Sequence, residues 1–201
     1  MTAKKQIGEI MSDKRIDKRI IHSKQFIKNA LIELMKEKTI DRISAVELCS
    51  RADVNRKTFY AHYFKVEDVL EEAENEMVAQ LKKHALPEEE KPDTVSLLKY
   101  IQKHSNEYLS LMQNRSSRIN EKMQVLIIDY GRRKHSGRNL SDRAWDIYCK
   151  TSNYGSTLLI EDWLNSGCSQ PAEKLSSMID NISTAIFQTF LEYMQDPSEQ
   201  Q

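Results

Sequence analysis

A chain of 201 residues is longer than one minimal module and shorter than two ordinary domains need, so we expect one core, or one core with a small appended unit. Apolar residues make up 39% and charged residues 30%, with only 5 Gly and 4 Pro, a composition that favours long helices over a β-sandwich or an open sheet. No apolar run approaches the length of about 18 residues that marks a membrane helix, and residues 1–11 offer no apolar stretch for a signal peptide. We therefore expect a cytoplasmic protein with no membrane partner.

The three cysteines do not form the pattern of a disulfide framework or a zinc site. Cys49, Cys149 and Cys168 are odd in number, lie far apart in the sequence, form no C-x-x-C pair and have no histidine at metal-ligand spacing. We expect reduced thiols that mostly pack in the interior, with no metal or other cofactor.

The net charge of zero hides an uneven distribution along the chain. Residues 1–65 hold 15 Lys and Arg against 8 Asp and Glu, a net of +7, and residues 66–201 hold 15 against 22, a net of −7. A basic segment attached to an acidic one suggests a polyanion-binding part carried by a body with another task. Basic helices are common, so an ordinary solvated basic surface is the alternative on charge alone.

Residues 13–38 are predicted to form a long amphipathic helix that follows a tail at residues 1–12. Apolar side chains recur at three-, four- and seven-residue steps, at Ile16, Ile20, Ile27, Leu31, Leu34 and Met35. The polar sides of the same helix carry the basic residues Lys14, Arg15, Lys18, Arg19, Lys24 and Lys28. Residues 39–43 break this periodicity and end the helix.

Two short helices are predicted next, separated by a sharp turn. Ser44 and Glu47 fit a capping box, in which each side chain binds the other residue's backbone N–H, so a helix begins there and runs to about residue 51. Asp53 tolerates the left-handed backbone that a tight turn needs, and Asn55 is a strong N-cap for a helix over residues 55–63. The residues expected to face inward and fix the angle between the two helices are Val46, Leu48 or Cys49, Val54 and Phe59.

This pair of helices has the form of a helix-turn-helix, whose second helix lies in the major groove of double-stranded DNA. Side chains near the start of that helix reach base edges, a role expected of Arg56, Lys57, Tyr60 and Ala61. Phosphate contacts are expected from Thr58, His62 and Lys65, and from backbone N–H groups near Ser44 and Ala45. Any small helical hairpin has a similar outline, so a purely structural role is the alternative.

The segment 43–70 resembles the DNA-binding signature of the tetracycline-repressor (TetR) family. Its most diagnostic part is Thr58-Phe59-Tyr60-x-His62-Tyr63, and the likeness extends back to about Lys14, over a little more than a quarter of the chain. The resemblance implies an all-α protein with an N-terminal three-helix DNA-binding domain, a helix-turn-helix, and a larger C-terminal helical domain for effector binding and dimerisation.

The sequence departs from this family pattern at three positions. Asp53 stands where members often have glycine, and Ala61 where they often have an aromatic residue. Val66 stands at the position of a phosphate-binding lysine, a charge for which Lys65 can substitute.

The rest of the chain is predicted to form a connecting helix over residues 66–86 and a larger helical part. The charged double-proline segment 87–93 marks the boundary between them. The helices predicted beyond it cover residues 94–112, 120–133, 141–165 and 171–194, with Gly167 at a helix C-cap and Pro171 in a first turn. The expected domains are therefore residues 1–65 for DNA binding and residues 94–201 for effector binding and dimerisation.

The C-terminal half contains aromatic side chains with polar tips, the kind that line a small-molecule pocket. The candidates are Tyr100, His104, Tyr108, Met112, Tyr130, Trp145, Tyr148, Cys149 and Ser152. Aromatic and methionine residues at helical spacing are also common in a plain core, which is the alternative. Because no clear charge lies among them, an apolar or aromatic effector is favoured.

The last two helices carry more apolar surface than a helical hairpin can bury by itself. In the family that the sequence resembles, two such helices pair with those of a second subunit as a four-helix bundle. The expected interface residues are Leu159, Trp163, Ile179, Ile182, Ile186 and Phe190. A two-fold homodimer also presents two recognition helices one DNA turn apart, about 34 Å, to a near-palindromic operator.

The sequence favours a transcriptional regulator over an enzyme, because it has no Gly-rich phosphate loop, H-E-x-x-H, G-x-S-x-G or paired-carboxylate pattern. We expect a homodimeric repressor that leaves its operator when a small-molecule effector binds. The alternative is a DNA-bound adaptor or co-activator whose C-terminal half binds a protein partner and no metabolite. A large buried pocket would favour the sensor, whereas a filled core with an exposed apolar patch outside the dimer interface would favour the adaptor.

Overall fold

The computed structural model describes residues 3–86, 93–135 and 141–195, and its regular elements are all helical. The all-α class expected from the scarcity of Gly and Pro is confirmed. None of the helices in these residues is long and apolar enough to cross a membrane.

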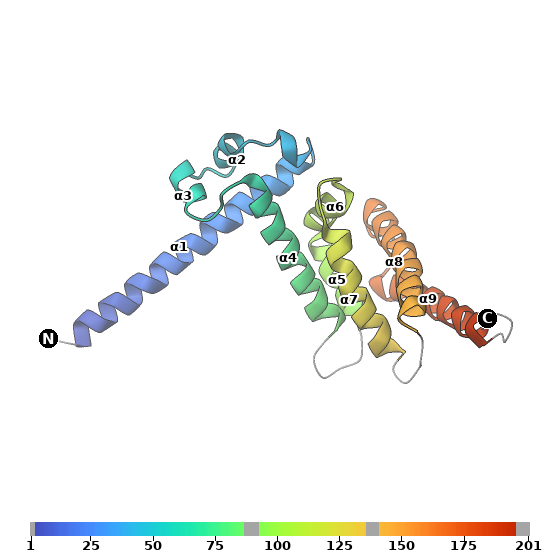
Figure 1. Cartoon of the computed structure of the whole chain (residues 1–201). Helices are drawn as coiled ribbons and strands as arrows, with labels where there is room; N and C mark the ends of the chain where they lie inside the picture. Colours follow the sequence, from blue (N-terminus) through green and yellow to red (C-terminus); the bar gives the residue numbers. More distant parts are fainter. Residues whose placement is uncertain (1–2, 87–92, 136–140, 196–201) are drawn as a thin grey trace. The chain divides into compact units, whose positions relative to one another are not determined.

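The chain divides into two compact units (Figure 1). Unit 1 comprises residues 1–73 and 113–117, and unit 2 comprises residues 74–112 and 118–201. The first division therefore falls inside a helix that the sequence assigned to a connector, and not at the double-proline segment.

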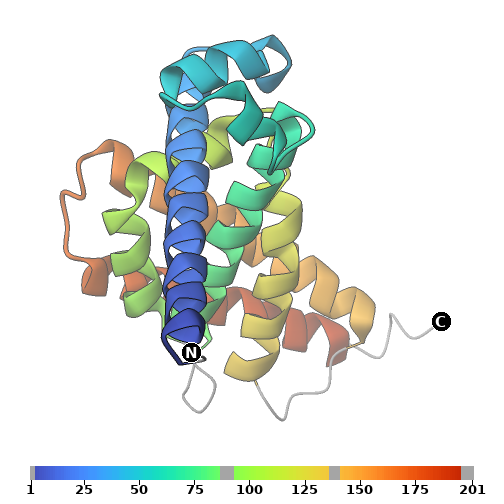
Figure 2. The ribbon, with the colours of Figure 1, turned by 90° about the vertical axis from the view of Figure 1, so that its left-hand side faces the viewer.

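Unit 1 is built from α1 (Ala3–Met35), the 3-10 helix η1 (Ile40–Arg42), α2 (Ala45–Arg51), α3 (Arg56–Tyr60) and the first part of α4 (Val66–Ala85). Figure 2 shows α1 as one unbroken helix. The expected tail at residues 1–12 is thus wrong for residues 3–12. That stretch has no proline and is rich in strong helix formers, so nothing in it stops the helix.

The interior of unit 1 is formed by the buried apolar side chains of its helices. Its fully buried members include Ile27, Leu31, Leu34, Leu48, Phe59, Val69 and Ala73. Val46, expected to face inward, is 56% exposed. At about 3.6 residues per turn, Val46 lies about 110° around the helix from the direction midway between Leu48 and Cys49, so it sits at the edge of the buried side and points to solvent.

Unit 2 continues with the rest of α4, then α5 (Thr94–Lys103), α6 (Ser105–Gln113), α7 (Ile119–Lys134), α8 (Asp142–Asn165) and α9 (Ala172–Gln195). Helix α8 packs on α7 and α9, and α5 packs on α9. A single helix was expected over residues 94–112, but the chain bends at His104, whose φ and ψ are −112° and 28°. The His104 N–H is shared between the carbonyls of Tyr100 and Ile101, both at 3.1 Å, which tightens the last turn of α5 and ends it.

The turn between α8 and α9 follows the Schellman pattern. Gly167 and Cys168 both have positive φ, 71° and 58°. The Cys168 N–H binds the carbonyl of Trp163 at 2.8 Å, and the Gly167 N–H binds that of Leu164 at 3.0 Å. The predicted glycine C-cap is confirmed, and it sets the two longest helices of unit 2 side by side.

Candidate functional sites

Both short helices of unit 1 begin at the predicted caps. Ser44 Oγ accepts the Glu47 N–H at 3.1 Å, and Asn55 Oδ1 accepts the Lys57 N–H at 2.8 Å. A hydrogen bond from Lys38 at 2.6 Å and another from the Ser44 backbone lower the pKa of Glu47, so the capping box keeps its negative charge. These contacts fix where α2 and α3 start.

The turn between α2 and α3 is also of the Schellman type. Asp53 is left-handed, with φ 51°, as the sequence predicted. The Val54 N–H binds the Cys49 carbonyl at 3.0 Å, and the Asp53 N–H binds the Ser50 carbonyl at 3.3 Å. Both acceptors lie at the end of α2, so these bonds fix the direction of α3 relative to α2.

The side chains predicted to contact DNA lie at the surface of unit 1. Exposed members of the set are Ser44, Arg56, Lys57, Tyr60, Ala61 and Lys65, and partly exposed members are Ala45, Thr58 and His62. Tyr60 is 57% exposed although its ring packs edge-on against Phe59, which is completely buried. One side of α3 thus anchors the helix while the other presents a basic and aromatic surface, whose contact with DNA stays a prediction.

The contacts just after α3 determine which group of Lys65 is free to bind at that surface. The carboxylate of Asp68 accepts the backbone N–H groups of Phe64 and Lys65 at 2.8 and 3.1 Å. Val66, at the position of the family's lysine, is buried. The backbone N–H of Lys65 is therefore already used, and its exposed side chain is the group available for a phosphate.

Several basic residues of unit 1 serve structural roles. Lys24 and Lys28 pair with Glu72, Lys38 pairs with Glu47, and Arg51 pairs with Glu37. In the described part of the chain Arg56, Lys57 and Lys65 form no such ion pair. Arg56, Lys57 and Lys65 therefore form one group of described basic side chains outside these ion pairs, at α3 and just after it.

A cavity of about 100 Å³ lies inside unit 2. Its walls come from the end of α4 and from α5, α6, α7, α8 and α9. The predicted pocket residues that line it are Tyr108, Tyr130, Tyr148, Cys149 and Ser152.

Four other predicted pocket residues do not line the cavity. Tyr100 and His104 stack on each other with ring centroids 4.4 Å apart, and Tyr100 also stacks on His84 at 4.7 Å. Trp145 packs in a core cluster with Tyr148, Cys149 and Phe187, and Met112 is buried elsewhere. Aromatic character alone did not separate the wall of the cavity from ordinary packing.

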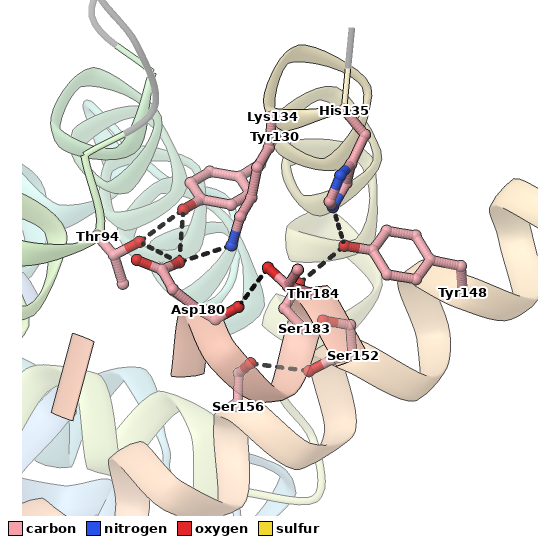
Figure 3. Close-up of polar contacts among 10 residues, drawn as sticks. All are labelled: Thr94, Tyr130, Lys134, His135, Tyr148, Ser152, Ser156, Asp180, Ser183 and Thr184. Atoms are coloured by element: carbon pink, nitrogen blue, oxygen red, sulfur yellow. Dashed lines mark hydrogen bonds and ion pairs between the residues drawn. The ribbon is translucent and has the colours of Figure 1, made fainter. Parts of the chain in front are cut away.

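One end of the cavity is a hydrogen-bonded group centred on Asp180 (Figure 3). Its Oδ1 accepts from Lys134 Nζ at 2.7 Å, from Thr94 Oγ1 at 3.2 Å and from the Tyr130 hydroxyl at 3.4 Å. Thr94 Oγ1 and the Tyr130 hydroxyl also lie 2.5 Å apart, so one hydroxyl can donate to the other in place of its bond to the carboxylate. The absence of a charge, from which an apolar effector was predicted, is therefore wrong, because an acid and a base both line this cavity.

A second polar chain lies beside this group (Figure 3). The Tyr148 hydroxyl is 2.8 Å from Ser183 Oγ and 2.9 Å from His135 Nε2, and the His135 ring stacks on Phe187 at 3.7 Å. Burial raises the pKa of Tyr130 to about 12 and also raises the pKa of Tyr148. It raises the pKa of the Cys149 thiol to about 11, so these groups stay protonated near neutral pH.

The polar lining residues that sequence reasoning missed include Thr94, Lys134, Asp180 and Ser183. A signal for two of them exists in α9, where Ser176, Asp180 and Ser183 recur at helical spacing, and Ser176 and Ser183 are buried. Polar residues on a buried stripe need partners, which indicates a polar interior site. Within the described residues, no group of His, Cys, Asp and Glu could hold a metal ion.

The predicted dimer residues differ in their accessibility. Trp163 is only 2% exposed, and its indole N–H donates to the Gln170 carbonyl at 2.7 Å. Ile179 is also buried within the chain, so the placement of these two at an interface is wrong. Leu159, Ile186 and Phe190 are half-buried and Ile182 is exposed. Other large exposed apolar side chains in the described part of α8 and α9 are Ile147, Tyr154, Leu158 and Met178.

Comparison with known proteins gives one family match and several similar structures. The family model TetR_C_8, described as a transcriptional regulator C-terminal region, matches residues 88–185. No curated protein matches the sequence significantly.

The similar structures include a TetR transcriptional regulator from Streptococcus agalactiae 2603V, with a TM-score of 0.63 and 19% identity over 85% of this chain and 98% of that one. A tetR-family regulator from Streptomyces coelicolor has a TM-score of 0.58 and 13% identity, over 85% of this chain and 82% of that one. The dihydroxyacetone kinase operon activator DhaS has a TM-score of 0.55 and 18% identity, over 84% of this chain and 97% of that one. At these identities the structures support the fold.

Proposed function

Because the chain belongs to the TetR family of transcriptional regulators, we propose that it is a repressor that a small-molecule effector releases from its operator. The observation that carries the DNA-binding part is the capped α2–turn–α3 arrangement, with Arg56, Lys57 and Tyr60 exposed on one side of α3. Arg or Lys near the start of a recognition helix can donate to guanine O6 and N7, and an aromatic ring can meet a thymine methyl group.

The protein acts as a homodimer in this proposal, because a near-palindromic operator needs two recognition helices. The surface that supports dimerisation is an apolar face on α8 and α9, which we define by the exposed residues Ile147, Tyr154, Leu158, Met178 and Ile182. On α8 these residues are spaced by seven and four positions, and on α9 by four, so each set forms a stripe along its helix.

The release step requires that the effector bind the DNA-free state more tightly than the DNA-bound state. A preference of about 100-fold corresponds to roughly 2.7 kcal/mol of coupling. The cavity of unit 2 is the proposed effector site. Helix α4 offers a direct path for the response, since it is one continuous helix that begins in unit 1 and ends in unit 2, where Ala85 lines the cavity.

A second candidate is an activator or adaptor whose C-terminal half binds a protein. Two observations favour keeping it: the cavity of about 100 Å³ is small beside the roughly 300–1,000 Å³ of typical ligand pockets, and one similar structure is named as an operon activator. Against it stands the polar lining of the cavity, which a purely structural core does not need.

The test is binding of the purified full-length protein to DNA flanking its own gene, titrated with salt and repeated with Lys57→Ala and Tyr60→Ala. We expect sequence-selective binding that falls steeply with salt and is weakened by both substitutions. Binding that ignores sequence and both substitutions would contradict the DNA-reading role of α3. Activation of transcription by the bound protein, with no loss of binding when small molecules are added, would favour the adaptor.

A further inference from the structure

The middle of the α8 face that lines the cavity is made of small polar residues. The lining positions on α8 are Tyr148, Cys149, Ser152, Asn153, Ser156, Thr157 and Ile160, an alternating spacing of one and three that marks one side of a helix. A helix face directed into a core normally carries large apolar side chains. Small residues here leave the space of the cavity open instead of filling it.

The hydroxyl groups of this face are satisfied within the helix. Ser156 Oγ donates to the Ser152 carbonyl at 2.8 Å, and Thr157 Oγ1 donates to Asn153 Oδ1 at 3.3 Å (Figure 3 shows the serine pair). A hydroxyl that donates to its own helix still has lone pairs to accept a further hydrogen bond. The α8 side of the cavity can therefore accept from a ligand.

A second polar part of the cavity wall contributes both a cation and an anion. Lys134 and Asp180 lie 2.7 Å apart, so their charges cancel locally, while Lys134 keeps further N–H groups and Asp180 keeps a second carboxylate oxygen. The Tyr130 and Thr94 hydroxyls bind the same carboxylate. This part of the wall can donate to and accept from a ligand without adding net charge.

Most of the remaining wall is apolar. It includes Leu97, Ile101, Met123, Leu126, Ile127 and Ile179. We propose that this cavity binds a small uncharged molecule that carries hydroxyl or carbonyl groups at one end and a short hydrocarbon part at the other. The inference rests on the proposed function only in taking this molecule to be the effector; binding itself is independent of it.

The neutral charge of the ligand follows from electrostatics. A buried ligand carboxylate or ammonium would bring an unpaired charge beside an ion pair that is already neutral, and an unpaired buried charge is strongly unfavourable. A neutral hydroxyl or carbonyl group matches donors and acceptors at both polar surfaces. The cavity of about 100 Å³ limits the ligand to a molecule about the size of a five-carbon diol.

The test uses the full-length protein and three probes of one chain length: 1,2-pentanediol, pentanoate and pentylammonium. Binding is measured by calorimetry and by the fluorescence of the protein, since Trp145 packs against Tyr148 at the cavity wall. We expect saturable binding of one diol per subunit, at least about tenfold tighter than either charged probe. Tighter binding of pentanoate or pentylammonium, or no saturation by the diol, would overturn the proposal.

Variants locate the binding site. Asp180→Asn should weaken diol binding by about tenfold, because it removes the charged acceptor of this end. The matched control is Glu173→Gln, which breaks the exposed Lys99–Glu173 pair, also at 2.7 Å, and should leave diol binding within about twofold. Ser156→Leu fills the cavity without touching the ion pair and should abolish binding, so it decides the question if Asp180→Asn does not fold. Undiminished diol binding by a folded Ser156→Leu protein would overturn the proposal.

Operator binding is measured separately in the same samples. Diol binding at the cavity without any effect on the DNA complex would leave this inference standing and contradict the effector role of the site. Release of the DNA complex by a charged probe, if that release depends on Lys134, would support the effector role of the site and overturn the inference that its ligand is uncharged.

Discussion

The ammonium group of Lys24 lies 2.7 Å from Oε2 of Glu72 and joins α1 to α4 within unit 1. Lys28, whose side chain is only 8% exposed, lies 3.5 Å from the other oxygen of the same carboxylate. Lys24 also stands 5.3 Å from the centroid of the Tyr63 ring. Two residues of the basic N-terminal segment thus hold the first part of α4 in place and do not belong to a free DNA-facing surface.

This arrangement predicts a pH-dependent loss of stability. Burial raises the pKa of Glu72, but the hydrogen bond and charge of Lys24, with the charge of Lys28, outweigh it and lower the pKa below its ordinary value. A carboxyl with a lowered folded-state pKa stabilises the protein fully above its unfolded pKa of about 4.3, and the contribution is lost as pH falls through the folded pKa. Glu72→Gln should therefore lower the free energy of unfolding by about 1 kcal/mol at pH 6 and by clearly less at pH 3.5.

Urea unfolding at the two pH values measures this difference. Glu33→Gln serves as the matched control, because its pair with Lys36 is exposed and should contribute little at either pH. An equal cost of Glu72→Gln at both pH values would show that the carboxylate charge does not stabilise the packing of α4 on α1.

The left-handed backbone of Asp53 gives a second prediction. A β-branched residue at positive φ is strained, so Asp53→Val should lower the free energy of unfolding by about 1–2 kcal/mol. Asp53→Gly removes the strain and should leave stability within about 1 kcal/mol. Asp41→Val, at an exposed residue of η1, is the control for adding valine and should cost less than about 0.5 kcal/mol. Similar losses for both valine variants in thermal unfolding would contradict the role of this turn.

The local features of unit 1 could be read from the sequence because each depends on residues close together in the chain. Ser44, Asn55 and Asp53 act through hydrogen bonds and backbone angles within a few positions. The helix of residues 94–112 was predicted as continuous because neither Gly nor Pro marks its break at His104. At this break the carbonyls of Tyr100 and Ile101 accept the same His104 N–H. No residue type in the sequence signals that arrangement.

The cavity could be predicted only in part, because its walls come from six helices. Tyr108, Tyr130 and Tyr148 were found from their aromatic character, which is a property of the residue alone. The pairing of Lys134 with Asp180 joins positions 46 residues apart, and it depends on how α7 and α9 pack. Trp163 was misplaced for the same reason, since only the packed unit shows that its indole faces inward.

The apolar face on α8 and α9 predicts where dimerisation can be disrupted. Leu158, 67% exposed, and Ile182, 42% exposed, should tolerate a charge in the isolated subunit but not inside an apolar interface. The double variant Leu158→Asp/Ile182→Asp should therefore stay helical and sediment as a monomer. Trp163→Asp, in contrast, should unfold the chain, because it places a charge in the interior of unit 2.

The matched control for the dimer experiment is Val125→Asp on α7, a substitution at a side chain that is 66% exposed but lies outside this face. It should sediment like the unchanged protein. A Leu158→Asp/Ile182→Asp protein that is still dimeric would place the interface elsewhere on the molecule.

The salt dependence of DNA binding tests the role of Lys65. Its side chain is exposed while Val66, at the family's lysine position, is buried, so the phosphate contact expected near this turn falls to Lys65. Each lost phosphate contact reduces the slope of log K against log salt by about 0.9, so a dimer that loses two contacts should change by about 1.8. Lys65→Ala should show this change, and Lys103→Ala, an exposed lysine of α5 in unit 2, should not. If Lys65→Ala leaves the slope unchanged, the Lys65 ammonium group does not reach a phosphate, and the loss of the family's lysine has no substitute in this protein.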